Sequence, residues 1–552
     1  MFRNPPNSIK FAKGLKDVLG VTKKGLKLNM FSDLSDIEIS GRIRDHLTTI
    51  CTEHPSIDTN KLPAFIPANQ HSDIDRMTVF KKLNSIKLTK ASPPDDLPKR
   101  LIKEFAYELS KPLTHVFNIS VKYGIFPECW KVATIIPLPK VKIVEELGEL
   151  RPVSLTPVLG KVLEGMVADT IMGDILPEVD ERQYGNLRGR STTHYLIYIT
   201  DLILRGIDEM HNMASLILID FRKAFDFVDH STAVTKLYLM GCRSELLPFV
   251  ADFLTGRRHR VRYQGVTSEY AEITCGVPQG TKLGPVVFMA MANDLVRTVM
   301  ERAKYVDDLS MAQITRILRE ITYQMQPKLD TLTQDCIDSL MAINPIKSHV
   351  MHVVPPKRPI VLPDLHLQGT PLPVVTECKL LGVYLNNEMN WQTHINYILT
   401  RARRCFFILY RARQFAFSVI TLLTLYHWYV RTALEYAAPV WHPGLTQDQT
   451  KKIERIQKRC FRIILRYRYT TYEDALRLLG ETSLHQRRET LTLRLARSIL
   501  RSPTHRGLLP PTLGDIHGRN TRHRRRLQPV RCRTARYQKS FVPYAVKLLN
   551  RL

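Results

Sequence analysis

The sequence has no C-x-x-C pair and no long apolar run. Its nine cysteines are scattered along 552 residues, which argues against a zinc knuckle and against a disulfide framework. Buried free thiols in a reducing compartment are expected instead. The longest apolar stretch, Val419–Val430, is short and is interrupted by Thr421, Thr424 and His427, and the first residues lack the apolar segment of a secretory signal. We therefore expect an intracellular, soluble protein of the nucleus and/or cytoplasm with no membrane partner, and the oligomeric state is left open.

Acidic residues are scarce in the C-terminal part of the chain. Residues 401–552 carry 32 Lys and Arg against 8 Asp and Glu, so +24 of the formal net charge of +28 lies there. The preceding 400 residues are close to neutral. A polyanionic partner such as nucleic acid explains one strongly basic segment better than a general need for solubility does.

The chain has no internal repeat, but its residue pattern changes along its length. Between about 130 and 385, apolar runs such as Val132–Lys140 and Ser215–Asp220 mix with helical segments, which predicts an α/β or α+β body. A Pro- and Asp-rich loop is expected at Lys90–Pro98. Helical periodicity is expected over six segments: 36–52, 77–86, 99–123, 392–410, 418–437 and 446–467.

Two acidic sites follow apolar runs. Asp220 ends Ser215–Asp220, and a carboxylate at the end of a buried strand is costly unless it is paired or binds a metal ion. The alternative is an N-cap of a helix that begins at Phe221. At Tyr305–Asp308, two adjacent acids lie between apolar neighbours, so they either face a cation or form a polar hairpin turn.

The order of these sites favours shared chemistry. Asp220 is followed by the glycine-bounded loop Gly276–Gly280 and then by Tyr305–Asp308. Two Mg²⁺ ions about 3.5–4 Å apart can activate a 3′-hydroxyl and stabilise a leaving pyrophosphate. Such a site needs carboxylates from at least two chain segments, because Mg²⁺ keeps several waters and takes few protein oxygens.

The order of motifs resembles the reverse transcriptase of non-LTR (LINE-type) retrotransposons, from about Lys90 to nearly the C-terminus. Asp220 falls on the first palm motif and Tyr305–Asp308 on the third, with Gly276–Gly280 and Leu283–Pro285 on the second. Asn344–Lys347 is similar to the fourth motif and Leu380–Val383 to the primer grip. Arg222 and Val306 depart from the usual Ser and Ala of these motifs, and neither departure removes a catalytic group.

The resemblance implies that Asp220, Asp307 and Asp308 are the catalytic metal ligands, with Asp308 the weaker one. They would hold two Mg²⁺ ions, with Mn²⁺ also possible. Phe225 would be a steric gate against the 2′-hydroxyl of a ribonucleotide, or else a core residue.

The resemblance also assigns residues to the incoming dNTP. Lys140 and Arg151 would hold its phosphates and Gln279 would position it. Lys347 would protonate the leaving pyrophosphate, or else be a solvated lysine.

Further residues would contact template and primer. Gln183, Tyr184 and Gly185, before Arg190–Thr193, would line the template path, and Gly382 would belong to the primer grip. A basic helix would grip the template–primer duplex or else present a solvated face; its residues are Lys451, Lys452, Arg455, Lys458, Arg459 and Arg462. Asp226 and His230 are interpreted as structural, and the cluster Arg522–Arg526 either binds RNA or acts as a nuclear-localisation signal.

The fold implied is an α+β right-hand polymerase with fingers, a palm with an antiparallel sheet, a helical thumb and a basic helical C-terminal region. The first ninety residues contain no acid and His constellation resembling the family's endonuclease, so that domain is expected to be missing. The expected boundaries are a linker or extension at 1–89, fingers at 90–210, palm at 211–390, a thumb-like region at 391–500 and a basic tail at 501–552.

The expected function is RNA-directed DNA synthesis for a transposable element. The reaction would transfer a nucleotidyl group from a dNTP to a primer 3′-hydroxyl, with an RNA template and a DNA primer as partners. One alternative is a truncated, inactive remnant that only binds nucleic acid. A second is an RNA-dependent RNA polymerase, against which Phe225 argues.

Overall fold

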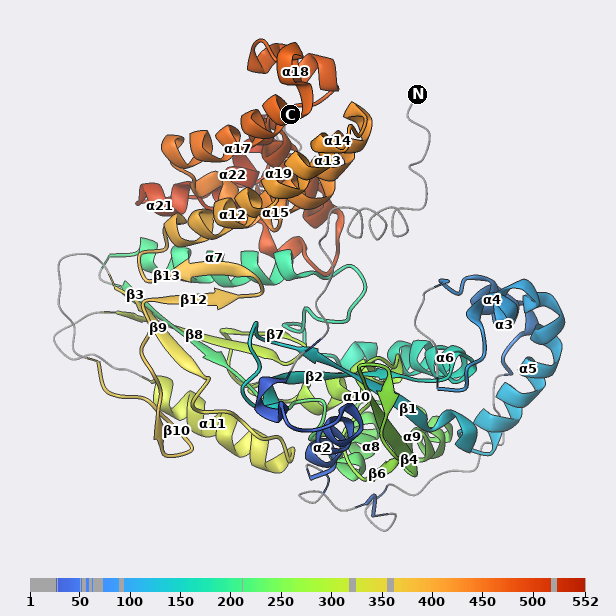
Figure 1. The fold of residues 1–552 in the computed structure, drawn as a ribbon. Coiled ribbons are helices and arrows are strands. Elements are labelled where there is room, and N and C mark those ends of the chain that lie inside the picture. Colours follow the sequence, from blue (N-terminus) through green and yellow to red (C-terminus); the bar gives the residue numbers. More distant parts are fainter. Residues whose placement is uncertain are drawn as a thin grey trace.

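The computed structural model describes residues 26, 28–49, 51, 56–58, 62, 73–88, 94–210, 212–316, 324–354, 362–517 and 524–551. Much of the expected N-terminal extension, the start of the loop at Lys90–Pro98 and the first two residues of the Arg-rich cluster at 522–526 lie outside the described residues. A four-stranded sheet lies at the centre, with helices on both faces and a second sheet to one side (Figure 1).

Every neighbouring pair of strands in the central sheet is antiparallel, in the order β7–β8–β3–β9. Its strands are β3 (Asn212–Ile219), β7 (Arg302–Tyr305), β8 (Asp308–Arg316) and β9 (His349–Val353). β3 is buried along its whole length because both faces of the sheet are covered. A strand buried on both faces is mostly apolar, which accounts for the apolar run Leu216–Ile219 that predicted it.

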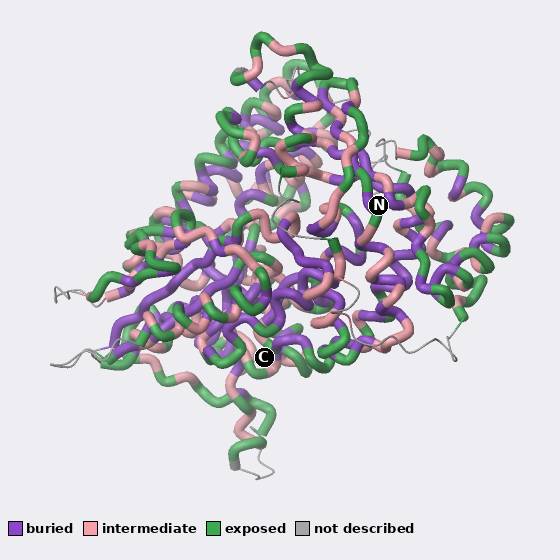
Figure 2. The backbone as a smooth tube through the Cα atoms, turned by 90° about the horizontal axis from the view of Figure 1, so that it is seen from below, coloured by how far each residue is buried: buried purple, intermediate pink, exposed green. Residues whose placement is uncertain are grey.

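The two faces of this sheet belong to two different cores. Leu216 and Leu218 of β3 point into one core, and Ile217 and Ile219 into the other, as the alternation of strand side chains requires. The first core holds helix α7 (Thr192–Asp208) and the C-terminal helices. The second holds helices α6 (Val158–Ile175), α8 (His230–Leu239), α9 (Leu247–Leu254), α10 (Leu283–Ala292) and α11 (Met325–Asp338). Figure 2 shows the buried residues running through the middle of the molecule.

The C-terminal helices stand over α7, on the side of the sheet away from α8 and α10 (Figure 1). The hairpin β12 (Glu377–Leu380) and β13 (Val383–Asn386) leads into them. The helices are α12 (Gln392–Arg404), α13 (Phe406–Gln414), α14 (Val419–Leu425), the π-helix η8 (Tyr426–Arg431), α15 (Thr432–Glu435), α16 (Ala438–Trp441), α17 (Gln447–Leu465), α18 (Tyr472–Leu479), α19 (Leu484–Arg501), α20 (Leu513–His517), α21 (Ala535–Gln538) and α22 (Phe541–Asn550).

The second sheet has the order β2–β1–β4–β5, with β6 also paired to β4. Its strands are β1 (Val132–Pro139), β2 (Leu150–Leu155), β4 (Arg257–Tyr263), β5 (Val266–Thr267) and β6 (Ala271–Ile273). β1 runs parallel to β4, although β1 precedes and β4 follows the boundary expected between fingers and palm at 210/211. The second sheet therefore contains strands from both sides of that boundary.

Four further helices and a small hairpin lie outside these groups. Helix α2 packs against the second sheet, and the other three helices lie beside α6 (Figure 1). The bounds are α2 (Asp36–Thr48), α3 (Arg76–Asn84), α4 (Lys99–Glu104), α5 (Ala106–Lys122), β10 (His366–Leu367) and β11 (Thr370–Pro371). In the described parts of the chain, no helix combines the length and the apolar character needed to cross a membrane.

Most expected elements are confirmed, and one alternative is wrong. No helix begins at Phe221: residues 222–227 form turns, and α8 begins at His230 with the Asp229 side chain accepting a hydrogen bond from the Thr232 amide. Asp220 is therefore not a helix cap. All nine cysteines are free thiols, and the five buried ones are Cys242, Cys275, Cys336, Cys378 and Cys460. The mixed α and β fold class agrees with the expectation.

Candidate active site

Asp220 and Asp308 come to the same end of the central sheet through strand pairing. β3 and β8 pair up to Ile219 opposite Leu309, so Asp220, the first residue after β3, comes next to the start of β8 at Asp308. Asp307 lies in the two-residue turn between β7 and β8, because Tyr305 pairs with Asp308. The three acids are spread over 88 residues of the sequence, and they lie together at one end of the sheet, exposed at the surface.

The charges of these acids act on one another. Burial raises the pKa of Asp308 to about 6, and the charges of Asp307 and Asp220 add to this rise. Burial also raises the pKa of Asp220; the charge of Asp307 adds to the rise, while Lys347 and Lys140 oppose it. This end of the sheet therefore carries a group of carboxylates, and a bound cation would relieve the repulsion between them.

The segment Asn344–Ser348 holds the backbone of Asp220. The Asn344 amide donates to the Asp220 carbonyl at 2.8 Å, and the Asp220 amide donates to the Ser348 hydroxyl at 3.1 Å. Ser348 in turn donates to the Asn344 carbonyl at 2.8 Å. Lys347, in the same loop, is exposed and close enough to Asp220 to lower its pKa.

A divalent metal ion fits the chemistry of this donor set. Among the described residues, no three His, Cys, Asp or Glu side chains are arranged to hold a metal ion by themselves. Mg²⁺ at phosphate-transfer sites takes only one or two carboxylates and completes its coordination with waters and substrate phosphates, so a closed protein cage is not required. The raised pKa values of Asp220 and Asp308 show that negative charge is unfavourable there without a cation, which suits such an ion.

The loop Gly276–Gly280 is fixed against both neighbouring segments. The Gln279 carbonyl accepts from the Ser154 amide on β2 at 2.8 Å, and the Gln279 side-chain amide donates to Asp226 at 3.1 Å. Gly276 has φ +78°, and a Cβ there would lie 2.6 Å from the Asp226 carbonyl oxygen. His230 hydrogen-bonds the Gly276 carbonyl at 2.8 Å, so both Asp226 and His230 contact this loop.

Phe225 is half-buried between this loop and the core. Its ring stacks on Phe288 of α10 with centroids 4.5 Å apart and planes at 20°, and its carbonyl accepts from the Val277 amide at 2.8 Å. The ring is therefore held in one orientation against the core, five residues after Asp220, which is compatible with either the gate or the core interpretation.

Lys140 and Arg151 both lie at the paired ends of β1 and β2. Leu138 pairs with Arg151, and the Lys140 amide donates to the Glu149 carbonyl at 2.9 Å. Both side chains are exposed, and Lys140 is near enough to Asp220 to affect its pKa.

The structure departs from the template contact expected for Gln183 and Tyr184. Gln183 is 1% exposed and Tyr184 is 4% exposed, so neither side chain faces a surface that a template could reach. With Gly185 they lie alongside β7, directly behind the turn that carries Asp307. Their position indicates a supporting role for that turn.

The hairpin turn at Gly382 packs against the C-terminal helices. The Leu381 carbonyl accepts from the Tyr436 hydroxyl at 2.7 Å, and a Cβ on Gly382 would lie 3.1 Å from the Tyr436 ring. The turn therefore has a fixed position beside the helices.

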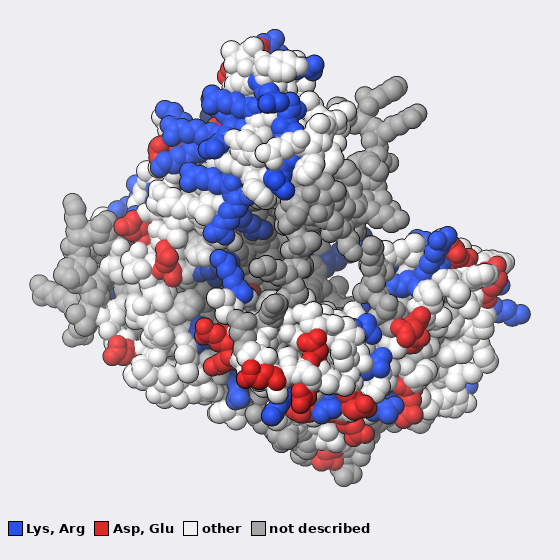
Figure 3. Space-filling model, viewed as in Figure 1, with Lys and Arg blue, Asp and Glu red and all other residues white. Residues whose placement is uncertain are grey.

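A basic groove runs between α13 and α17. Lys and Arg side chains gather over this part of the molecule (Figure 3). The groove has a volume of about 870 Å³ and is lined by Tyr410, Arg413, Gln414, Ala416, Arg455, Lys458, Arg459, Arg462, Ile463 and Arg466. Lys451 and Lys452 do not line it, and Lys452 is paired with Asp448 at 2.7 Å.

A second basic feature was not expected from the sequence. A cavity of about 320 Å³ between α3, α4 and α6 is lined by five lysines: Lys82, Lys87, Lys99, Lys161 and Lys282. The Thr156 hydroxyl also lines it, and this buried atom has no hydrogen-bond partner in the described structure. Burial lowers the pKa of Lys161, and the charges of Lys99 and Lys282 lower it further against the opposing charge of Glu164. No sequence signal could have shown this cavity, because its lysines come from four separate segments.

Comparison with known proteins identifies the domain. Residues 138–385 match the family described as reverse transcriptase (RNA-dependent DNA polymerase). The chain is 25% identical over 459 residues to the probable RNA-directed DNA polymerase from transposon BS of Drosophila melanogaster, covering 78% of this chain and 49% of the relative. It is 27% identical over 446 residues to that from transposon X-element of the same species, covering 76% and 48%. A third relative is the RNA-directed DNA polymerase from mobile element jockey, 28% identical over 323 residues, covering 56% and 35%.

Residues 138–385 are therefore the part of the chain that matches the reverse transcriptases, and the expected resemblance to those of non-LTR retrotransposons is confirmed. It spans about half the length of the first two relatives.

Proposed function

We propose that this protein is an RNA-directed DNA polymerase of a non-LTR retrotransposon, which adds dNTPs to a primer 3′-hydroxyl. The observation that carries the proposal is the meeting of Asp220, Asp307 and Asp308 at one edge of an antiparallel sheet, where burial and mutual repulsion raise the pKa of Asp308 to about 6. The positive charges of Lys347 and Lys140 act on Asp220 at the same end of the sheet.

In this proposal, Asp220, Asp307 and Asp308 hold the divalent ions, Mg²⁺ or Mn²⁺. Two such ions supply activation of the primer hydroxyl and neutralisation of the charge that develops on the leaving pyrophosphate. Lys347 is the candidate to give a proton to that pyrophosphate, because it is exposed and its charge acts on Asp220.

The nucleotide site is proposed to lie between the acids and the second sheet. Lys140 and Arg151 are exposed at the paired ends of β1 and β2, and the charge of Lys140 acts on Asp220. They suit the triphosphate, Lys140 as a point charge and Arg151 as a bidentate donor. The Phe225 ring, fixed by Phe288, would lie under the sugar. Gln279, anchored by Ser154 and Asp226, would support the templating pair.

The proposed architecture is a right hand, with fingers at 90–210, palm at 211–390, a thumb at 391–500 and a basic region at 501–552. The strands β4, β5 and β6 join the fingers sheet in space although they follow position 210. The turn at Gly382 would contact the primer, and the basic groove along α17 would follow the backbone of the template–primer duplex. The five-lysine cavity includes Lys282, which lies three residues after Gln279, and it suits phosphates of the incoming template strand.

The test is primer extension on poly(rA)/oligo(dT) with dTTP and Mg²⁺. We expect extension by the wild type, and a loss of at least about 100-fold in Asp307→Asn, because electrostatic groups at the reacting centre commonly contribute 10²–10³-fold. Asp338→Asn, which removes an exposed acid on α11, is the matched control and should extend normally.

Binding of the same duplex, measured by fluorescence anisotropy, separates the alternatives. A folded wild type that binds the duplex without extending it with either Mg²⁺ or Mn²⁺ would support the nucleic-acid-binding remnant instead. Extension that is unaffected by Asp307→Asn would contradict the assigned site.

A further inference from the structure

The turn that carries Asp307 has an unfavourable backbone conformation. Val306 is the first residue of the two-residue connection between β7 and β8, and its φ is +61°. Glycine or asparagine usually occupies such positions, because a β-branched side chain clashes with its own backbone there. A strained residue of this kind persists only where its surroundings hold it.

The Gln183 carboxamide holds this turn from behind. Its Oε1 accepts from the Val306 amide at 3.3 Å and from the Gly185 amide at 2.9 Å. A Cβ on Gly185 would lie only 2.6 Å from the Val306 nitrogen and from its Cγ2, so the two segments are in close contact. Among the described residues, the buried Gln183 is the one side chain that accepts a hydrogen bond from the strained Val306 amide.

The segment that carries Gln183 is itself paired with β7. The Tyr184 amide donates to the Lys304 carbonyl at 2.8 Å, and the Lys304 amide donates to the Arg182 carbonyl at 2.9 Å. The segment thus forms a short parallel continuation at the edge of the central sheet. Any shift of this segment along β7 would move Gln183 away from Val306.

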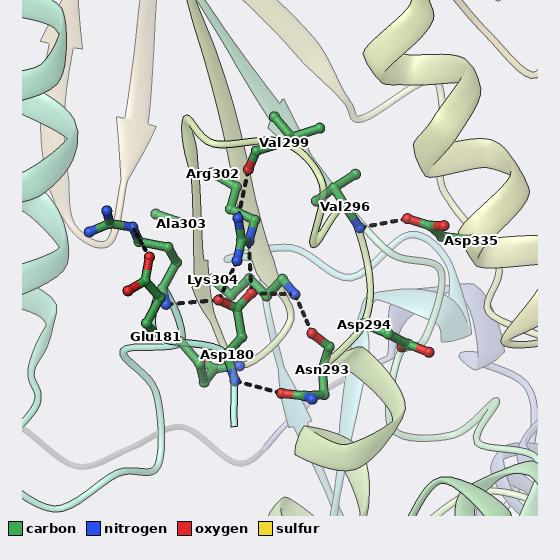
Figure 4. Close-up of polar contacts among 12 residues, drawn as sticks. Asp180, Glu181, Asn293, Asp294, Val296, Val299, Arg302, Ala303, Lys304 and Asp335 are labelled. Carbon is green, nitrogen blue, oxygen red and sulfur yellow. Dashed lines mark hydrogen bonds and ion pairs between the residues drawn. The ribbon is translucent and has the colours of Figure 1, made fainter. Parts of the chain in front are cut away.

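Asp180 anchors this segment by a buried ion-pair cluster (Figure 4). Its carboxylate accepts from Arg302 at 2.7 and 2.9 Å and lies 2.8 Å from the Lys304 Nζ. It also accepts from the Arg182 amide at 2.9 Å. Asn293 directly follows α10. Its side-chain oxygen accepts from the Asp180 amide at 2.8 Å, and its backbone carbonyl accepts from Lys304 Nζ at 2.7 Å.

The cluster is closed to solvent. The side chains of Asp180, Arg302 and Lys304 are 0%, 7% and 2% exposed. Burial alone would raise the pKa of Asp180, but hydrogen bonds from Arg302 and the charge of Lys304 outweigh burial and hold that pKa well below its usual range. Burial lowers the pKa of Lys304 to about 8 although Asp180 opposes this. Arg302 and Lys304 are two residues apart on β7, so both charges face the same side of the strand.

We propose that Asp180, Arg302 and Lys304, acting through Gln183, are positioning residues that hold the strained Val306–Asp307 turn so that Asp307 and Asp308 stay opposite Asp220. The inference rests on the proposed function, since it concerns the acids assigned there to catalysis. None of the positioning residues touches substrate: they fix the turn from the buried side of the sheet.

The decisive variant is Gln183→Leu, which keeps the volume and removes the acceptor. We expect kcat for primer extension to fall at least tenfold, while KM for dTTP and Kd for the duplex stay within twofold, because the acids and not the nucleotide site are displaced. Amide exchange of the peptide spanning Tyr305–Leu309 should become at least tenfold faster than in the wild type.

Glycine at position 306 provides a rescue. Val306→Gly removes the strain that Gln183 opposes, so Gln183→Leu should lower kcat less than threefold in that background. A role in general packing would give the same loss in both backgrounds. Asp180→Asn should reproduce the effects of Gln183→Leu, and Gln183→Met replaces Gln183→Leu if the latter does not fold.

The matched control is Gln457→Leu on α17. Its carboxamide is also buried, and its Oε1 accepts from the Leu484 amide at 3.2 Å and from the Tyr472 hydroxyl, far in sequence from the turn. This variant should leave the kcat and the exchange of Tyr305–Leu309 within twofold of the wild type. Wild-type kcat and exchange in Gln183→Leu would overturn the positioning role while leaving the proposed function intact. If the wild type does not extend at all, the proposed function fails, and the exchange comparison still decides whether Gln183 and Asp180 hold the turn.

Discussion

At the scale of single residues, the candidate site depends on side chains whose orientation is fixed by neighbours outside it. The Phe225 ring stacks on the fully buried Phe288, and Gln279 is bonded to Asp226. Asp220 has its backbone fixed by Asn344 and Ser348. Groups held in this way lose little entropy when a substrate binds, which is the advantage of a preorganised site.

Phe225 gives a test at this scale. In Phe225→Ala, the discrimination between dTTP and rUTP, measured as the ratio of kcat/KM values, should fall at least tenfold, because a ring that excludes the 2′-hydroxyl has been removed. A tenfold change corresponds to about 1.4 kcal/mol of differential transition-state binding.

Phe225→Tyr is the control for this prediction. It keeps the aromatic ring and its stacking on Phe288, so sugar selectivity should stay close to that of the wild type. Unchanged selectivity in Phe225→Ala would return Phe225 to the role of a core residue and would reopen the RNA polymerase alternative.

At the scale of elements, the basic groove is a joint product of α13 and α17. Helix α17 buries Ile453, Ile456 and Ile464 on one face, which leaves its basic residues on the other. Arg459 lies over the Phe406 ring at 5.0 Å and Arg462 over the Tyr469 ring at 5.2 Å. Aromatic neighbours therefore orient two of the guanidinium groups in or beside the groove.

Charge reversal on this helix should weaken duplex binding. We expect Arg459→Glu combined with Arg462→Glu to lower the affinity for an RNA–DNA duplex at least tenfold. The slope of log K against log salt concentration should fall by about 1.8, since each lost phosphate contact removes about 0.9. Fluorescence anisotropy measured from about 50 to about 200 mM salt gives both the affinity and the salt slope.

The same charge change on α19 provides the control. Arg494 and Arg497 are exposed but do not line the groove. Their combined replacement by Glu should change the salt slope much less. Equal losses from the two pairs of substitutions would show that net charge, and not the groove, determines binding.

At the scale of the whole molecule, buried neutral histidines link stability to pH. Burial lowers the pKa of His194, His259 and His394 to about 4 and that of His442 to about 3. Because these folded-state values lie below the ordinary value of 6.5, the unfolded chain takes up protons first as pH falls. Their contribution to stability is complete above about pH 6.5 and is lost progressively toward pH 4. Glu164 and Asp201, whose pKa values burial raises to about 7 and about 6, act in the opposite direction.

His394 isolates one such contribution. It is 1% exposed and accepts a hydrogen bond from the Tyr384 amide at 3.4 Å. His394→Asn should be less stable than the wild type at pH 7.5, and this difference should shrink by about 2 kcal/mol at pH 5.0, since only the wild type loses stability to proton uptake at this position. Urea unfolding at the two pH values measures the difference.

An exposed histidine is the control for the pH prediction. His115 lies on the exposed side of α5, and His115→Asn should change stability little at either pH. A stability difference between His394→Asn and the wild type that does not depend on pH would contradict a neutral, buried His394.

Much of the fold and the acidic site could be predicted from local patterns. The runs at β1 and β3 and the acids of the β7–β8 turn appear in the sequence as apolar runs and as Tyr305–Asp308, because strand burial and turn chemistry depend on adjacent residues. The amphipathic pattern of α17 predicted its basic face in the same way.

The positions of Gln183 and Tyr184 could not be predicted. The motif alone favoured a template contact, whereas the burial of both residues depends on a pairing with Lys304, more than a hundred residues away. The pairing of β1 with β4 across the expected domain boundary is equally non-local.

The sequence by itself determined which groups are available: three acids, a glycine-bounded loop, an aromatic residue after Asp220 and a basic C-terminal region, because residue type and spacing fix chemistry and local conformation. Only the tertiary structure decided what surrounds these groups. The register of β3 with β8 brings Asp220 opposite Asp308, and the buried Asp180 cluster supports the Val306 turn. Such contacts join residues distant in the chain, and their energies depend on burial and distance, which exist only once the chain has folded.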